Sequence, residues 1–164
     1  MPGAEGPCEA ALCRLKDRRL FCVFRLGSGA PYGESFSDDE GKTWTTPVAM
    51  KNMRSVEPCL LAMPSGVVLL SGGRPGLDIW INADGAASDW QHIDMKAHHN
   101  RFEPKDPIAA AGQTSAYTHL VQLDDTHLLY VYDRIPFSWN AIPKVSAESN
   151  SVWVMRVTVE RTAP

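Results

Sequence analysis

A strand–turn–strand unit occurs three times in this 164-residue chain and limits the fold more than any other feature. Each copy has two apolar runs joined by a short polar turn, and the copies span residues 9–25, 57–74 and 117–133. The turns contain Lys, Asp, Ser, Pro and Gly, which are residue types that tight turns select. The copies begin 48 and then 60 residues apart, which indicates a repeated β-structure with insertions in its loops.

One further strand is expected in each repeat, at Tyr32–Phe36, Leu77–Ile81 and Val152–Val159. The last of these alternates apolar and polar residues, as a half-buried strand does. Four-stranded units of about 40–50 residues are typical of β-propeller blades. The chain is therefore predicted to be all-β, with blades at residues 8–50, 55–95 and 114–160.

No segment shows the apolar period of an amphipathic helix. Residues 94–113 and 135–150 contain proline and lack a regular pattern, so both are expected to be long loops between strands. His98 and His99 fall in the first of these segments, and a loop is a better interpretation of that pair than a metal site.

The segment Ser37–Trp44 fits the pattern Ser-x-Asp-x-Gly-x-Thr-Trp at every defined position. Ser and Asp side chains bond nearby backbone N–H groups and hold tight turns. Gly41 allows a positive φ, and the Trp44 ring is expected to lie against the blade. A weaker copy occurs at Asn82–Gly85, with Trp90 one place late, whereas the third repeat has no such segment.

Polar residues that suit a binding or catalytic site recur where the apolar runs end. In chain order they are Glu9, Arg25, Arg74, Tyr117 and Asp133. Glu9 and Arg25 are 16 residues apart, as are Tyr117 and Asp133. Each of these spacings covers one hairpin, so both members of a pair are expected at the same end of a blade.

Arg74 lies one residue late relative to Arg25 in the repeat. A slip of one residue in a strand moves a side chain to the opposite face of the sheet. We therefore expect Gly72 and Gly73 to form a bulge or a turn that brings Arg74 back to the site.

The two patterns together resemble a known family. Ser37–Trp44 resembles the Asp-box, the repeat of bacterial neuraminidases (BNR repeat). The order of polar residues resembles the C-terminal half of the sialidases (exo-α-neuraminidases), over residues 8–134. The resemblance implies a six-bladed β-propeller, of which residues 1–164 supply about three four-stranded blades.

The resemblance also implies roles for the five residues. Tyr117 would be the nucleophile of a retaining hydrolase that releases terminal sialic acid or a related acidic sugar, and Glu9 would be its general base. Arg25 and Arg74 would bind the sugar carboxylate, and Asp133 would hold an arginine in place. Arginine forms paired, charge-assisted bonds with carboxylates, and sialidases are the glycosidases with a tyrosine nucleophile.

Several alternatives stay open at this point. Glu57 competes with Glu9 for the role of base, because Ser55–Pro58 also resembles the family's glutamate strand. Tyr117 is alternatively a packed core tyrosine, and Arg134 is a candidate partner for Asp133. The whole chain is alternatively a non-catalytic Asp-box propeller that binds glycan or protein, because a fold does not determine a function.

The family's first arginine and its acid/base aspartate have no counterpart before Glu9. The chain by itself is therefore expected to be inactive or nearly so, because general-acid catalysis contributes roughly 10²–10⁴-fold. Three blades also cannot close a ring, since propellers contain about four to eight. The missing side is expected from an N-terminal propeller half or from self-association.

Composition restricts the other partners. The formal net charge is −3, which does not favour nucleic acid. No apolar run is long enough to span a membrane. Residues 1–6 lack a basic segment followed by an apolar one, so the chain as written is expected to be cytoplasmic, or secreted if a signal precedes it.

The four cysteines show no metal-binding or redox spacing. Cys13 and Cys22 either face each other across a hairpin or, as their apolar surroundings favour, are buried free thiols. No cofactor and no metal are expected.

Overall fold

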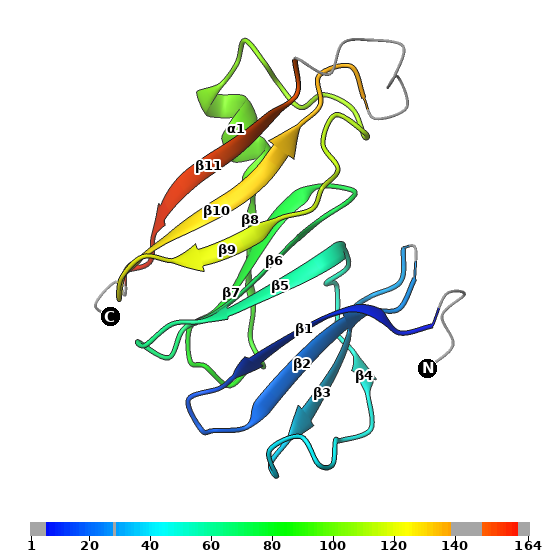
Figure 1. Ribbon diagram of the computed structural model, residues 1–164, viewed down its shortest axis with the longest axis vertical. Helices are drawn as coiled ribbons and strands as arrows, with labels where there is room; N and C mark the ends of the chain where they lie inside the picture. The colour runs from blue at the N-terminus through cyan, green and yellow to red at the C-terminus, as the bar shows by residue number, and fades with distance from the viewer. Residues whose placement is uncertain (1–5, 28, 139–148, 161–164) are drawn as a thin grey trace.

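A computed structural model describes residues 6–27, 29–138 and 149–160. Within these residues it contains three antiparallel sheets (Figure 1). The first sheet consists of β1 (Cys8–Arg14), β2 (Leu20–Arg25), β3 (Gly33–Ser37) and β4 (Val48–Ala49). The second consists of β5 (Val56–Ala62), β6 (Val68–Gly73), β7 (Leu77–Asn82) and β8 (Gln91–Asp94). The third consists of β9 (His119–Gln122), β10 (His127–Arg134) and β11 (Ser151–Thr158). All three predicted hairpins and all three additional strands are confirmed.

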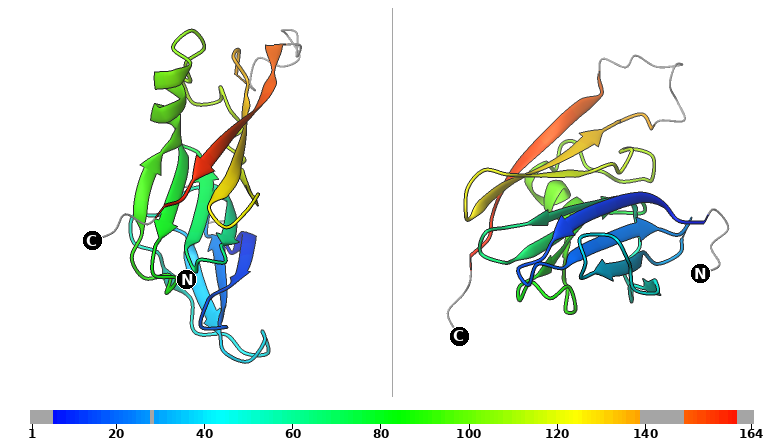
Figure 2. Two further views of the ribbon diagram at one scale, coloured as in Figure 1. Left: turned by 90° about the vertical axis from the view of Figure 1, so that its left-hand side faces the viewer. Right: turned by 60° about the horizontal axis from the view of Figure 1, so that its bottom comes forward.

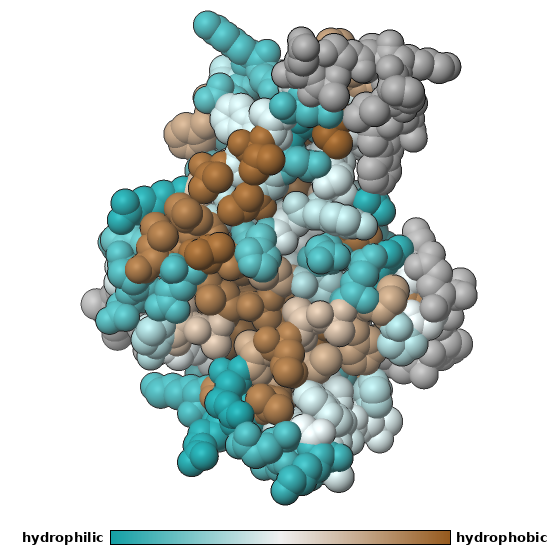
Figure 3. Space-filling view, viewed as in Figure 1, coloured by the Kyte–Doolittle hydropathy of each residue, from teal (hydrophilic) through white to brown (hydrophobic). Residues whose placement is uncertain are grey.

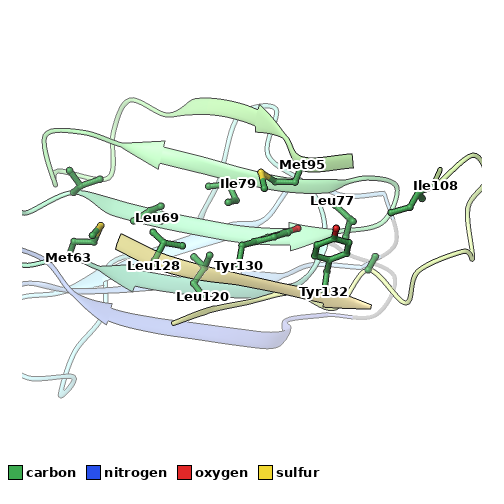
Figure 4. Close-up of a cluster of buried hydrophobic side chains, with 12 residues drawn as sticks. Met63, Leu69, Leu77, Ile79, Met95, Ile108, Leu120, Leu128, Tyr130 and Tyr132 are labelled. Atoms are coloured by element: carbon green, nitrogen blue, oxygen red, sulfur yellow. The ribbon is translucent and has the colours of Figure 1, made fainter. Parts of the chain in front are cut away.

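The sheets form successive layers in which β1, β5 and β9 are neighbours (Figures 1 and 2). Apolar side chains fill the space between layers because alternate residues of a strand face opposite sides of its sheet. In β6, Val68 and Leu70 pack toward the first sheet and Leu69 packs toward the third. Figure 4 shows the second of these layers, where Leu69 of the second sheet lies near Leu128 of the third. Strand β6 of the second sheet is thus buried on both faces.

The three hairpins share one register, which confirms the repeat. The pairs nearest the turns are Arg14 with Leu20, Ala62 with Val68, and Gln122 with Leu128. Counting back from these pairs makes Glu9, Glu57 and Tyr117 equivalent positions. The backbone agrees for the first two, since Glu9 has φ +45° and Glu57 has φ +47°, each beside a shift in strand register.

Within the part of the chain that is described the third sheet has three strands, so its fourth strand stays a prediction. One expectation about secondary structure is wrong. Helix α1 (Met95–Phe102) begins inside the predicted loop 94–113, while residues 103–113 are irregular as expected. The second predicted loop, 135–150, is irregular at 135–138, and its residues 139–148 lie outside the described residues, as do residues 1–5. No described helix is long and apolar enough to cross a membrane.

The sequence pattern did not predict helix α1 because the buried side of this helix is partly polar. Asp94 caps the helix by accepting a 2.8 Å bond from the N–H of Ala97. His99 is fully buried, donates from Nε2 to the carbonyl of Asp106 (2.9 Å) and accepts from the Tyr132 hydroxyl at Nδ1 (2.6 Å). Burial also raises the pKa of Tyr132 to about 12. A buried histidine does not register as an apolar position in a sequence pattern.

The Ser37–Trp44 turn forms the bonds that its residue types predict. Ser37 Oγ accepts from the N–H of Gly41 at 2.9 Å, and Asp39 accepts from the N–H and the hydroxyl of Thr43. Gly41 has φ +83°. The Trp44 ring lies over this turn and donates to the carbonyl of Gly41 at 3.1 Å, but it stays 42% exposed rather than joining the core.

The weaker copy is the same turn with one extra residue. Asn82 Oδ1 accepts from the N–H of Ala87, five residues on, and Trp90 donates to the carbonyl of Ala87 at 3.2 Å. Ala87, with φ +60°, therefore stands where Gly41 stands in the first turn, and Gly85 does not. The insertion explains why Trp90 comes one place late.

The four cysteines are free thiols. Cys13 pairs with Phe21 and Cys22 with Leu12, so the two cysteines do not face each other across the hairpin. Burial raises the pKa of Cys13 to about 11, which keeps it protonated at neutral pH.

Candidate functional site

All five predicted residues lie at one end of the three sheets, where β1, β5 and β9 begin, on the right-hand side of Figure 1. Glu9 and Tyr117 lie at or before the start of an inner strand, and Arg25, Arg74 and Asp133 lie at or just after the end of the strand that returns beside it. The hairpin spacing therefore predicted their shared location correctly.

Glu9 ties the first two sheets together. Its Oε1 forms a 2.8 Å ion pair with Arg25, whose side chain is 13% exposed. Its Oε2 accepts a 2.8 Å bond from the N–H of Glu57 on the neighbouring inner strand. Both carboxylate oxygens are engaged, which is the arrangement of a structural ion pair.

Arg74 reaches the site in a different way from the one expected. Gly72 and Gly73 stay paired with β7, and the chain turns at Arg74 itself, which has φ +59° and donates its N–H to the carbonyl of Gly76 at 2.9 Å. The guanidinium then donates to the carbonyl of Ser115 at 2.9 Å and lies 5.8 Å from the centre of the Tyr117 ring. The predicted bulge at the glycine pair is wrong.

The glycine pair serves close approach instead. A Cβ on Gly73 would overlap the backbone oxygen of Ala116, and a Cβ on Gly72 would overlap the hydroxyl of Tyr32. The missing side chain of Gly73 therefore allows the segment before Tyr117 to lie directly against β6, while that of Gly72 leaves room for Tyr32. This packing brings the Tyr117 segment beside Arg74.

Asp133 holds the segment before Tyr117. Its Oδ1 accepts from the hydroxyl of Thr114 at 2.7 Å and from the N–H of Ser115 at 2.8 Å. Because the carbonyl of Ser115 accepts from Arg74, Asp133 acts on that arginine through the backbone of Ser115.

Arg134 has other partners than Asp133. It is 2% exposed and donates to the Asp106 carboxylate at 2.7 Å and to the carbonyls of Gln113 and Pro107. Arg134 therefore anchors the loop after α1, and the interpretation of Arg134 as the partner of Asp133 is wrong.

Three arginines line one hollow of about 330 Å³, which we call the arginine hollow. They are Arg25, Arg54 and Arg74, and the rest of the lining consists of Gly29, Ser55, Val56 and Pro75. Sequence reasoning missed Arg54 because it lies in the connection to β5, outside the repeat. Its neighbour Met53 is buried and bonded to Tyr32, which positions this connection beside the strand ends.

Tyr117 opens onto a second hollow of about 350 Å³, the tyrosine hollow, which is also lined by Glu57, His119, Tyr132 and Asp133. The Tyr117 side chain is 50% exposed, so the interpretation of a packed core tyrosine is wrong. Glu57, the competing candidate, shares this hollow with Tyr117, whereas Glu9 does not line it.

A larger hollow of about 860 Å³ lies between the outer strands of the first two sheets and shares Arg54 and Pro75 with the arginine hollow. Asp78 and His92 line it and are 2.7 Å apart. Burial raises the pKa of Asp78, although His92 acts in the opposite direction. The sequence did not indicate this hollow, because its walls come from two different blades.

The two smaller hollows place guanidinium groups beside an exposed phenol. Three guanidinium groups at one place favour a carboxylate or another planar anion. No group of three metal-ligating residues exists among the residues described.

Comparison with known proteins finds similar structures but no match by sequence. No family model and no curated protein matches the sequence. A protein of unknown function from Dyadobacter fermentans superposes with a TM-score of 0.66 at 21% identity, over 94% of this chain and 38% of that one.

Two enzymes show the same likeness. The first is an intramolecular trans-sialidase from Ruminococcus gnavus in complex with oseltamivir carboxylate, with a TM-score of 0.60 at 18% identity over 95% of this chain and 33% of that one. The second is a GH93 α-L-arabinofuranosidase of Fusarium graminearum with arabinobiose, with a TM-score of 0.58 at 16% identity over 94% of this chain and 46% of that one. The chain thus spans less than half the length of each of these three proteins. Since the identities are low, the likeness establishes the fold: this all-β chain has the sheet arrangement found in β-propeller glycoside hydrolases.

Proposed function

We propose that this chain forms the arginine-lined side of a sialidase-like glycoside hydrolase site that takes a terminal acidic sugar, with sialic acid as the first choice. The observation that carries the proposal is that Arg25, Arg54 and Arg74 line one hollow while Arg74 also lies over the ring of Tyr117. We also propose that the three sheets belong to a six-bladed ring.

The chemistry follows from the charge of such a sugar. Sialic acid carries its carboxylate on the anomeric carbon, where it would repel a carboxylate nucleophile, whereas a phenol is neutral until it reacts. The oxygen of Tyr117 attacks the anomeric carbon as a base takes its proton, and the bond to the leaving group breaks. Water then cleaves the glycosyl–tyrosine bond, which retains the configuration of the sugar.

Glu57 is the better candidate for the base. It shares the tyrosine hollow with Tyr117. Glu9 already uses both carboxylate oxygens, one for Arg25 and one for the backbone of Glu57. The assignment of Glu9 from the sequence is therefore less favoured by the geometry within one chain.

An acidic sugar suits the arginine hollow better than a neutral one. The arabinofuranosidase of Fusarium graminearum holds arabinobiose, which has no charge. Three guanidinium groups would gain little from such a ligand, whereas they form charge-assisted bonds with a carboxylate.

A second candidate function is binding without turnover. The engagement of Glu9 with Arg25 favours it, because that ion pair competes with a sugar carboxylate for the guanidinium. Asp-box proteins without a glycosidase site fit the same fold, and the glycan or protein partner would then occupy the arginine hollow without reacting.

Titration calorimetry of the chain with free sialic acid and with arabinobiose tests the proposal. We expect sialic acid to bind, and Arg74→Ala to weaken it at least about tenfold, as loss of one charge-assisted bond does. Arg101→Ala on α1 is the matched control, because it removes the same charge away from both hollows, and it should leave the affinity unchanged. Binding of arabinobiose in preference to sialic acid would contradict the proposal.

A further inference from the structure

The outer face of the third sheet is largely apolar, and on β11 it includes one charged residue, the exposed Arg156. Trp153 and Met155 of β11 pack toward the second sheet, so Val152 and Val154 point away from it. These two valines are 71% and 53% exposed, and Val121 on β9 is 43% exposed. Figure 3 shows hydrophobic side chains gathered over this sheet and continuing over the inner strands below it. Contiguous exposed apolar surface of this kind marks an interaction site.

The first sheet also has an apolar outer face. Phe21 and Val23 pack toward the second sheet, so Leu12, Leu20 and Cys22 belong to the opposite side. Leu12 is 55% exposed. The stack of three sheets therefore ends in an apolar face on both sides, which we call the first-sheet face and the third-sheet face.

We propose that a second copy of this chain packs against these faces, with the third-sheet face of each copy on the first-sheet face of the other. Each joint would repeat the packing that already joins the first sheet to the second and the second to the third. Two such joints close six sheets into a twofold ring. This inference rests on the proposed six-bladed ring and names the partner that completes it.

Charge at the hairpin turns favours a second copy over an unrelated partner. The turn of the third sheet carries Asp124 and Asp125, and the turn of the first sheet carries Lys16 and Arg18, all exposed. Asp17 lies between these two basic residues, but it forms an ion pair with Arg19 at 2.7 Å, so the turn stays basic. Stacked sheets bring their turns together: the Lys16 side chain already lies so close to the turn of the second sheet that a Cβ on Gly66 would be 2.9 Å from it. The proposed joint would place the acidic turn beside the basic turn of the other copy, so one chain carries both halves of the complementarity.

The second copy would also complete the site. The step from β1 to β5 brings the carboxylate of Glu9 to the backbone of Glu57, and the step from β5 to β9 places Glu57 and Tyr117 in one hollow. The same step from β9 to β1 of the second copy would bring Tyr117 beside that copy's Glu9. Glutamates would then flank Tyr117 on both sides.

Sedimentation equilibrium of the full chain over a wide concentration range tests the partner without any sugar, so its outcome is independent of the proposed activity. We expect a dimer of the 18.1 kDa chain, and Val154→Glu should weaken dimerisation about 100-fold or more, because it buries a charge in an apolar joint. Val48→Glu is the matched control, since Val48 is equally exposed at 53% but lies on β4, opposite Glu34 on the side that faces the second sheet. Circular dichroism verifies that each variant is folded.

Mixing two variants identifies the faces that meet. Leu12→Glu and Val154→Glu should each be monomeric alone, whereas an equal mixture should form a heterodimer, because one of its two joints contains neither substitution. A dimer of Leu12→Glu that is as strong as the wild type would mean that like faces meet, and would overturn the proposal. A wild-type chain that stays monomeric, or that grows into open filaments, would overturn it as well.

Discussion

The hairpin ends of the first and third repeats share a spacing and a register, yet their polar side chains are engaged differently. At the first, Glu9 and Arg25 close on each other in a 2.8 Å ion pair. At the third, Tyr117 is half exposed, and Asp133 bonds the backbone of Ser115 instead of reaching across to Tyr117. One scaffold therefore supplies a closed end that joins sheets and an open end that is free for chemistry.

The largest effect is expected when the phenol oxygen of Tyr117 is removed from the open end. In the form of the protein that hydrolyses a fluorogenic sialic-acid glycoside, the proposed dimer, Tyr117→Phe should lower the rate roughly 10³-fold or to background, because the nucleophilic oxygen is lost. The ring and its contact with Arg74 remain, so binding of free sialic acid should change little. Turnover that survives this substitution would rule out Tyr117 as nucleophile.

A side chain at Gly73 should push the segment before Tyr117 away from β6 and lower the stability of the fold. Gly73→Ala places a methyl group on the backbone oxygen of Ala116 and should destabilise the fold by about 3 kcal/mol, as overpacking does. Urea unfolding measures this. Gly29→Ala is the control: a Cβ there meets nothing within 4 Å and only the positive φ opposes it, so about 1 kcal/mol is expected. Equal losses for the two variants would show that Gly73 has no special packing role.

Breaking the Glu9–Arg25 ion pair should lower the stability of the fold slightly less than Gly73→Ala does. Glu9→Gln leaves the largely buried Arg25 without its carboxylate and should lower the free energy of unfolding by about 2 kcal/mol, less than for a fully buried pair. Glu40→Gln is the control because its partner Arg14 is well exposed, and such pairs contribute little. If both variants unfold at the same urea concentration, the Glu9–Arg25 pair contributes no more to the stability of the fold than an exposed ion pair does.

The smallest expected effect concerns the support of Arg74. Asp133→Ala should weaken sialic acid binding about tenfold, since Ser115 loses its acceptor and no longer holds Arg74. Asp133→Asn retains the acceptor oxygen and should restore most of the affinity. An alanine variant that binds normally would show that Asp133 does not position Arg74.

Local residues of the site were predictable where the repeat carries them. Glu9, Arg25, Tyr117 and Asp133 were found because hairpin spacing alone brings both ends of a unit together. Arg54 was missed because it belongs to a connection whose path depends on the burial of Met53. The predicted partner of Arg134 was wrong because the true partner, Asp106, is brought to it by the packing of helix α1 on the third sheet.

The three hairpins, their common register and the bonds of the Ser37–Trp44 turn follow from the order of amino acids, because these depend on alternation and on contacts between near neighbours. Packing in three dimensions settles which glutamate shares a hollow with Tyr117, how Arg74 reaches that tyrosine, and that three arginines line one hollow. Those relations join residues of different sheets, and stacking between sheets is set by side-chain packing that no local pattern records.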